Sequence, residues 1–178
     1  MRNLILVAAF LISGCWTGDM FYAATELRAP VAPGDYRLLS PDGQSDDARV
    51  SILPDGLTRF TPRDDREPVG VGFATLDADR GIFVAWVATI GEEAAPSDTT
   101  VYGLLEARPD GEYAILMPSC LEMETLATSA GATIVPDSKV RSCRFPDRAS
   151  LETALRQLVP RLPTEGARLV ALRDAGRD

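Results

Sequence analysis

Apolar and polar residues alternate over residues 34–117, which is the pattern of β-strands with one covered face. Seven runs of this kind are expected as strands, at 35–39, 49–53, 57–61, 69–76, 82–90, 99–107 and 113–117. Pro-Asp-Gly separates two pairs of them, at 54–56 and at 109–111. Proline presets one turn dihedral and glycine takes the left-handed position, so both tripeptides predict hairpins. Residues 40–47 are expected as a polar loop.

The two longest runs flank the turn 77–81, and we expect Leu76 to lie opposite Ile82. Counting back along both strands then places Gly72 opposite Trp86. In that register the indole covers the bare backbone that the glycine leaves. The second run is apolar at nearly every position, so we expect it to be covered on both faces.

After residue 117 the apolar positions take the spacing of helices. A helix is expected over 121–130 with Gly131 at its end, and a second one begins at a cap formed by Asp147 or Ser150. Pro160 should end or kink the second helix. Its apolar stripe is Leu151, Leu155, Leu158 and Leu162. Three further short strands are expected at 133–135, 140–145 and 167–173. The fold class is therefore α+β, a curved antiparallel sheet of about seven strands, open or barrel-like, with two C-terminal helices.

The first fifteen residues form a separate pattern. Arg2 precedes the uncharged run 4–12, and Ser13-Gly14-Cys15 follows. A basic start, a short apolar core and small residues at the cut are the features of a secretory signal. The end of the segment resembles the lipobox of bacterial lipoproteins. The apolar run is nine residues long, whereas a membrane crossing needs about 20.

The lipoprotein resemblance implies how the chain is processed. In that family the signal peptide is cut just before the cysteine, whose thiol carries a diacylglycerol and whose amino group is usually acylated. The implied layout is a signal peptide over 1–14, a lipidated N-terminus and tether over 15–33, and one α+β domain over 34–178. Trp16, not Asp, follows the lipidated Cys15, which in this family favours the outer membrane with the domain facing the periplasm. A short helix over 20–28, capped by Asp19, and a flexible tether are both open for the segment after the anchor.

Two cysteines remain in the mature part of the chain, Cys120 and Cys143. An even pair in an exported protein is expected to form a disulfide. The bridge would close a loop of 24 residues, for which the chain-entropy relation gives roughly 3 kcal/mol of stabilisation. Two thiols or a metal site are the alternatives. A metal site would need more soft ligands, and the chain has no His.

The charge of the chain limits its partners. The net charge is −8 over 178 residues, and removal of the signal peptide with Arg2 makes it −9. An acidic surface argues against binding nucleic acid or anionic lipid headgroups. It is compatible with a basic protein partner, and equally with a role in solubility alone. The 164 residues of the mature chain are enough for one domain with a core.

The absence of His removes the Ser-His-Asp and Cys-His arrangements and His-ligated metals. Val69-Gly70-Val71-Gly72 lies inside a strand pattern, so its glycines indicate packing and no phosphate loop. Carboxylates remain as candidates in Asp64-Asp65 and Glu92-Glu93, and both pairs lie in polar loops. Asp42, Asp46 and Asp47 do not have the spacing of a calcium loop. Lys139, the one lysine, lies in a polar turn. We expect no catalytic residue, no cofactor and no metal.

The sequence therefore predicts a location more firmly than an activity. We expect an outer membrane lipoprotein held to the bilayer through Cys15, not an enzyme, that binds a periplasmic partner or stabilises an assembly. A small acidic disulfide-bonded β-domain on a lipid anchor is also similar to periplasmic inhibitors of lysozyme, although their inhibitory loop is not matched here. A third hypothesis is a carboxylate-dependent hydrolase of cell-wall glycan.

Overall fold

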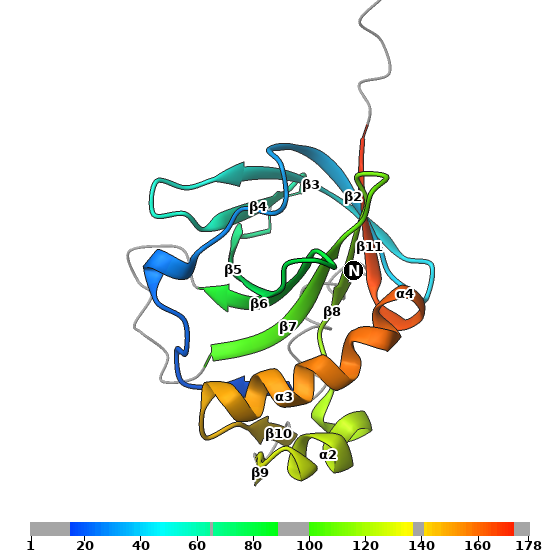
Figure 1. The fold of residues 1–178 in the computed structure, drawn as a ribbon. Helices are drawn as coiled ribbons and strands as arrows, with labels where there is room; N and C mark the ends of the chain where they lie inside the picture. Colours follow the sequence, from blue (N-terminus) through cyan, green and yellow to red (C-terminus); the bar gives the residue numbers. More distant parts are fainter. Residues whose placement is uncertain (1–14, 65, 89–99, 137–140, 173–178) are drawn as a thin grey trace, which may run out of the picture.

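The computed structural model describes residues 15–64, 66–88, 100–136 and 141–172. Eight antiparallel strands close into a barrel, and the helices pack on one side of it (Figure 1). The barrel strands are β2 (Gly34–Leu39), β3 (Ser45–Ile52), β4 (Thr58–Pro62), β5 (Val69–Asp77), β6 (Ile82–Ala88), β7 (Thr100–Ala107), β8 (Tyr113–Leu116) and β11 (Ala167–Ala171). The expected α+β class and antiparallel meander are confirmed, and the sheet is closed.

Strand β11 is what closes the barrel. Strands β2 to β8 form a meander in which each strand pairs with the next, and β11 pairs with both β8 and β2. Three more strands extend the sheet outside the barrel: β1 (Trp16–Gly18), β10 (Arg141–Arg144) and β9 (Thr133–Pro136). The described residues thus contain eleven strands, so the expectation of about seven is too low. The seven runs of the meander all form strands, and the three further short strands expected from the sequence are present as β9, β10 and β11. Only β1 was not expected.

The register between β5 and β6 is confirmed at its centre and wrong at its end. Gly72 lies opposite Trp86, as the sequence predicts. A β-bulge lies between Thr75 and Asp77, so Asp77, not Leu76, lies opposite Ile82. The bulge inserts one extra residue into β5. An arginine of the covering helix donates a hydrogen bond to the carbonyl oxygen of that residue, from Arg156 Nη1 to Leu76 O at 3.0 Å.

The expected polar loop over 40–47 is too long, because β3 already begins at Ser45. Asp46 and Asp47 therefore belong to a strand, and only Asp42 remains in the connection. Asp47 lies opposite Arg37 in the sheet, and Asp35 lies opposite Arg49. Both pairs form ion pairs, at 2.7 Å and 3.1 Å. Opposite charges across an antiparallel pair stabilise the pairing, which is why acidic residues can extend this strand.

The two expected helices are α2 (Cys120–Ser129) and α3 (Arg148–Leu158). Asp147 is the N-cap of α3, and its side chain accepts a hydrogen bond from the Ser150 backbone N–H at 2.8 Å. The helix ends at Leu158 and continues as the 3₁₀ turn η2 (Val159–Arg161), which contains Pro160, and the short helix α4 (Leu162–Glu165). The predicted stripe of leucines is fully buried: Leu151, Leu155, Leu158 and Leu162.

Alternate residues of the barrel wall belong to two separate cores. The outer core lies between the wall and the helices, and its largest wall residues are Ile82, Trp86, Tyr102 and Leu104. The lumen core lies inside the barrel and includes Phe73, Leu105, Tyr113, Ile115 and Leu169. Helix α3 runs along the outside of β7, with α2, β9 and β10 beyond it (Figure 1). The expectation that the β6 strand is covered on both faces is confirmed for its central residues Val84, Ala85 and Trp86, while Val87 at its end is exposed.

The segment 15–33, which was expected to be a tether, is packed into the folded body. Trp16, Tyr22 and Val31 are buried, because β1 pairs with β7 and the chain then crosses the outer core. The expected helix over 20–28 is reduced to the 3₁₀ turn η1 (Ala24–Glu26). The large apolar residues of this segment pack against the barrel individually, so the segment does not need a helix to place them on one face.

Candidate functional site

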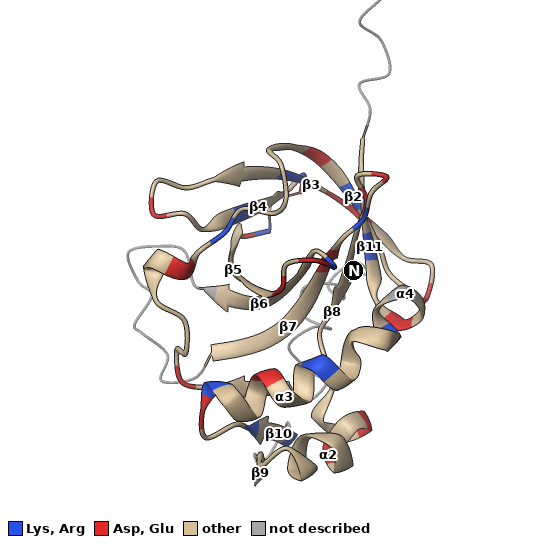
Figure 2. Ribbon diagram, viewed as in Figure 1, with Lys and Arg blue, Asp and Glu red and all other residues tan. Residues whose placement is uncertain are grey.

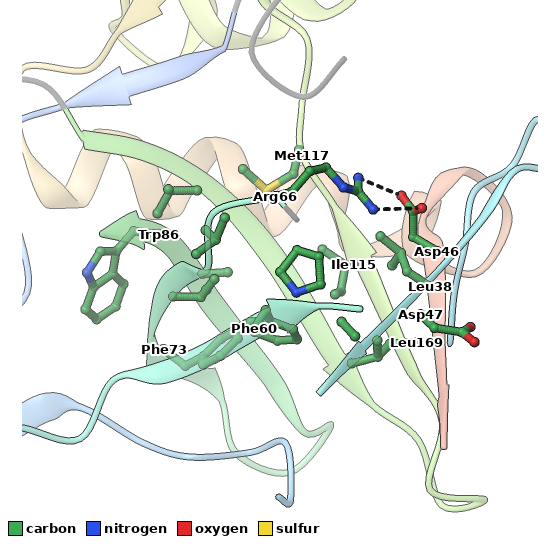
Figure 3. Close-up of a pocket in the computed structure, with 16 residues that line it drawn as sticks. Leu38, Asp46, Asp47, Phe60, Arg66, Phe73, Trp86, Ile115, Met117 and Leu169 are labelled. Atoms are coloured by element: carbon green, nitrogen blue, oxygen red, sulfur yellow. Dashed lines mark hydrogen bonds and ion pairs between the residues drawn. The ribbon is translucent and has the colours of Figure 1, made fainter. Parts of the chain in front are cut away.

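The barrel contains an apolar cavity of about 260 Å³ that is partly open to solvent (Figure 3). Its walls are Leu38, Ala48, Phe60, Pro62, Val69, Val71, Phe73, Ala85, Trp86, Val87, Ile115, Met117 and Leu169. These residues come from β2 to β6, from β8 with the residue that follows it, and from β11. Alternation places them on the inner face, except Trp86, which belongs to the outer core. Eight strands leave room inside for side chains or for one small ligand.

Successive connections of the meander alternate between the two ends of the barrel, because its strands are antiparallel. One end is closed by Val31, Tyr36 and Tyr113, which are all buried. The two tyrosine rings meet edge to face at 6.2 Å, and the Tyr36 hydroxyl donates a hydrogen bond to Ala32 O at 3.0 Å. The cavity lies toward the opposite end, which we call the mouth, where residues 40–44, 63–64 and 66–68 lie.

An arginine at the mouth pairs with carboxylates of two different segments, and Figure 3 shows its pair with Asp46. Arg66 donates hydrogen bonds to Asp46 at 3.1 Å and to Asp64 at 2.7 Å. About a quarter of the Arg66 side chain is exposed, so it lies at the boundary between the cavity and solvent. The Arg66 guanidinium holds the pKa of the Asp64 carboxyl below its usual range. Its two hydrogen-bonded carboxylates raise the pKa of Arg66 itself.

A second ion pair lies beside the first. Asp47, which also lines the cavity, accepts two hydrogen bonds from Arg37 at 2.7 and 3.0 Å. These hydrogen bonds lower the pKa of Asp47. The mouth therefore has carboxylates that stay ionised at neutral pH, each held by a guanidinium.

Of the acidic candidates from the sequence, Asp46 and Asp64 meet at Arg66 and Asp47 lies beside them, each carboxylate held by an arginine. Asp42 accepts hydrogen bonds from Gln44 in its own hairpin, while Asp46 and Asp47 bind different arginines. Asp65, Glu92-Glu93 and Lys139 lie outside the described residues. In the part of the chain that the structure describes, no group of three or more Cys, Asp or Glu is placed to hold a metal ion.

Cys15 lies beside the mouth end of the barrel wall. It forms an isolated antiparallel bridge with Ser119, two residues after Met117 of the cavity wall. The Cys15 side chain is buried, and burial raises the pKa of its thiol. The residue expected to carry the lipid is thus attached directly to the barrel, with no spacer between them.

The expected disulfide between Cys120 and Cys143 is present. Both cysteines are fully buried in the outer core. Cys120 is the first residue of α2 and Cys143 lies in β10, opposite Trp16 of β1. The bridge therefore fixes α2 to the strands outside the barrel and has no part in the cavity.

Sequence reasoning missed the cavity and its polar residues Asp46 and Arg66. One signal for Asp46 was readable: Asp35-Tyr36-Arg37 and Asp47-Ala48-Arg49 carry matching charges for an antiparallel pair. That pairing makes 45–49 a strand and turns Asp46 inward. No comparable signal distinguishes Arg66 from its neighbour Arg63 in the charged connection.

The charges outside the mouth are mixed in sign. Figure 2 shows acidic and basic residues interspersed over strands and helices. None of the helices among the described residues is both long enough and apolar enough to span a membrane. No protein-family model, no curated protein and no solved structure matches this chain.

Proposed function

We propose that this protein is a lipid-anchored envelope protein that catalyses no reaction and binds one small apolar or amphipathic molecule inside its barrel. The cavity is the observation that supports this proposal. Its wall is apolar, it lies in a barrel of eight strands, and its charged residues are confined to the mouth. Ligand sites of proteins usually combine an apolar wall with a few placed polar groups.

The volume of the cavity sets the size of the molecule. An apolar cavity of about 150 Å³ binds benzene, which has six carbons. By proportion, a cavity of about 260 Å³ takes an apolar group of roughly ten carbons. A straight chain of that length, or one or two rings, is the expected apolar part of the ligand.

The ionised carboxylates at the mouth support binding over catalysis. A general acid at neutral pH needs a carboxyl whose pKa is raised, as burial in an apolar site does. The pKa values of Asp47 and Asp64 are lowered instead, because each accepts hydrogen bonds from an arginine. A glycan hydrolase built on these residues would lack its proton donor.

The position of Cys15 fits delivery from a membrane. Through the bridge with Ser119, the proposed anchor lies close to Met117 at the mouth. A chain held this closely keeps the mouth near the lipid surface, where apolar molecules collect. Two or more acyl chains on Cys15 would make that attachment stable.

Binding is tested with the full chain carrying Cys15→Ser, which has no lipid, and with 1-decanol as the ligand in titration calorimetry. We expect saturable binding of one molecule. Val71→Phe adds a ring to the cavity wall and should abolish it, whereas Val135→Phe makes the same change on the exposed part of β9 and should not. Equal binding by both variants would contradict a site in the lumen.

The anchor is tested separately, by fractionating bacterial cells that express the natural chain and the Cys15→Ser chain. We expect the natural protein in the membrane fraction with a lipid-sized mass increase on Cys15. The variant should be released or left with its signal peptide. Recovery of the natural protein as a water-soluble species without lipid would contradict the anchor and leave the cavity proposal untouched.

A further inference from the structure

The polar residues of the cavity all lie at one place. Of the residues that line it, Asp46, Asp47 and Arg66 are charged and the others are apolar. An amphipathic ligand has to bury its apolar part in the wall and leave its polar end beside Asp46 and Arg66, because Asp47 alternates with Asp46 along β3 and pairs with Arg37 on the outer face. Their arrangement therefore selects which polar end is accepted.

The Arg66 guanidinium at the mouth already forms ion pairs with carboxylates of the protein. Arg66 pairs with Asp46 at 2.9 Å and with Asp64 at 2.7 Å, so two negative charges face one positive charge. The remaining lining carboxylate, Asp47, is paired with Arg37. Arg66 with its two carboxylates therefore carries a net charge of −1, while Asp47 and Arg37 neutralise each other. A ligand anion would have to displace a carboxylate that is close and well aligned.

We propose that the lumen selects amphiphiles with an uncharged or cationic polar end and rejects those that end in a carboxylate or phosphate. This inference rests on the proposed function, because it describes the ligand of the same cavity. A hydroxyl can accept from Arg66 and donate to Asp46 without breaking their pair. An ammonium adds a favourable charge interaction, whereas an anion meets the surrounding carboxylates.

Three probes with the same ten-carbon chain test the inference: 1-decanol, decyltrimethylammonium and decanoate. Each is titrated at neutral pH, below its micelle concentration, into the full chain carrying Cys15→Ser. We expect the first two to bind and decanoate to bind at least about tenfold more weakly, which corresponds to about 1.4 kcal/mol. Equal affinity for all three, or tightest binding of decanoate, would overturn this inference and leave the lumen site standing. Binding of none would overturn the proposed function.

A variant pair locates the discrimination. Asp46→Asn removes one of the carboxylates on Arg66 and should reduce the discrimination against decanoate by several-fold. Asp42→Asn removes the same charge from the neighbouring hairpin, where Asp42 binds Gln44 and does not line the cavity, and should leave it unchanged. If the two variants behave alike, the local arrangement at Arg66 does not set the preference.

Salt gives a second readout that needs no variant. Raising the ionic strength from about 0.01 M to about 1 M shortens the screening length from roughly 30 Å to 3 Å. Discrimination that comes from charge should shrink over this range, while binding of 1-decanol should not weaken. Discrimination that is independent of salt would show that shape selects the ligand, and the charge inference would be wrong.

Discussion

The two faces of strands β5, β6 and β7 carry alternate residues of the same short sequences, yet they differ in how completely they are packed. On the outer face Ile82, Trp86 and Tyr102 are at most 3% exposed. On the inner face Phe73 and Leu105 are equally buried, whereas Val71 is half-buried and lines a cavity of about 260 Å³. The difference lies in what covers each face. A helix can move until it fits the side chains below it, whereas the width of a closed barrel is set by its strand number.

The outer face also recruits the N-terminal segment. The Tyr22 ring stacks on the Trp86 indole at 5.1 Å between ring centres, and the Arg148 guanidinium lies over the same ring at 4.4 Å. The Tyr22 hydroxyl donates a hydrogen bond to Glu152 at 3.2 Å. The segment after Cys15 is thus held between the barrel and α3. We infer that the outer face supplies most of the stability and that the inner face is left available for a ligand.

Truncating one leucine on each face gives the largest expected difference. Leu155→Ala, at a fully buried position of the outer core, should lower the free energy of unfolding by about 3–5 kcal/mol. Leu38→Ala enlarges an existing cavity at a half-buried position and should cost about 1 kcal/mol. Urea denaturation of both variants measures the two values. Equal losses would show that the lumen is packed as tightly as the outer core.

Much of this comparison could be read from the sequence, and the leucine stripe of α3 shows why. Four leucines at helical spacing allow one arrangement, with all of them on the buried face. The pairing of Gly72 with Trp86 followed in the same way, from a short turn between two long strands. Both features are determined by residues that are close together in the sequence, so they can be predicted from the sequence alone.

The features that were missed depend on distant segments. Strand β11 closes the barrel by inserting between β8 and β2, and nothing in its five residues specifies that position. The bulge at Leu76 exposes a carbonyl oxygen that accepts a hydrogen bond from Arg156, in a helix 80 residues further on. The segment 15–33 has too little periodicity to predict its packing against the barrel. The cavity itself follows from closure, so it could not be predicted before closure was known.

Breaking the disulfide tests whether the outer covering holds together independently of the lumen. Cys143→Ser should lower the free energy of unfolding by about 2–4 kcal/mol, because the unfolded chain regains the freedom of the loop. Binding of 1-decanol to the folded variant should not change, since neither cysteine lines the cavity. Free-thiol titration of the denatured, unreduced Cys15→Ser chain should find none. Two reactive thiols would contradict the bridge.

A substitution at Gly72 probes its contact with Trp86 across strands β5 and β6. A Cβ at Gly72 would lie 2.1 Å from the Trp86 Cε2 atom, so Gly72→Val must displace an indole that Tyr22 already covers. We expect a loss of about 1–3 kcal/mol. Gly34→Val is the matched control, because a Cβ there meets its nearest side-chain atom at 3.4 Å. A neutral Gly72→Val would show that the indole does not lie over the glycine.

The smallest expected effect is the response of stability to pH. With no His in the chain, no side chain of ordinary pKa titrates between pH 5 and 8, so the melting temperature should be constant over that range. Hydrogen bonds from Arg49, Arg37 and Arg66 hold the pKa values of three carboxyls below their usual range, those of Asp35, Asp47 and Asp64. A lowered pKa in the folded state means that the carboxylate stabilises the fold above the ordinary value of about 4, and that this contribution is lost as the pH falls through the lower value. The melting temperature should therefore begin to fall only below about pH 4.

Because these ion pairs are exposed, high salt should make the fall shallower. Asp47→Asn removes one of the three groups and should flatten the acid limb, while Asp42→Asn, in the hairpin beside it, serves as the control. A melting temperature that already falls between pH 8 and pH 5 would contradict the prediction, because it would require a group with a raised pKa.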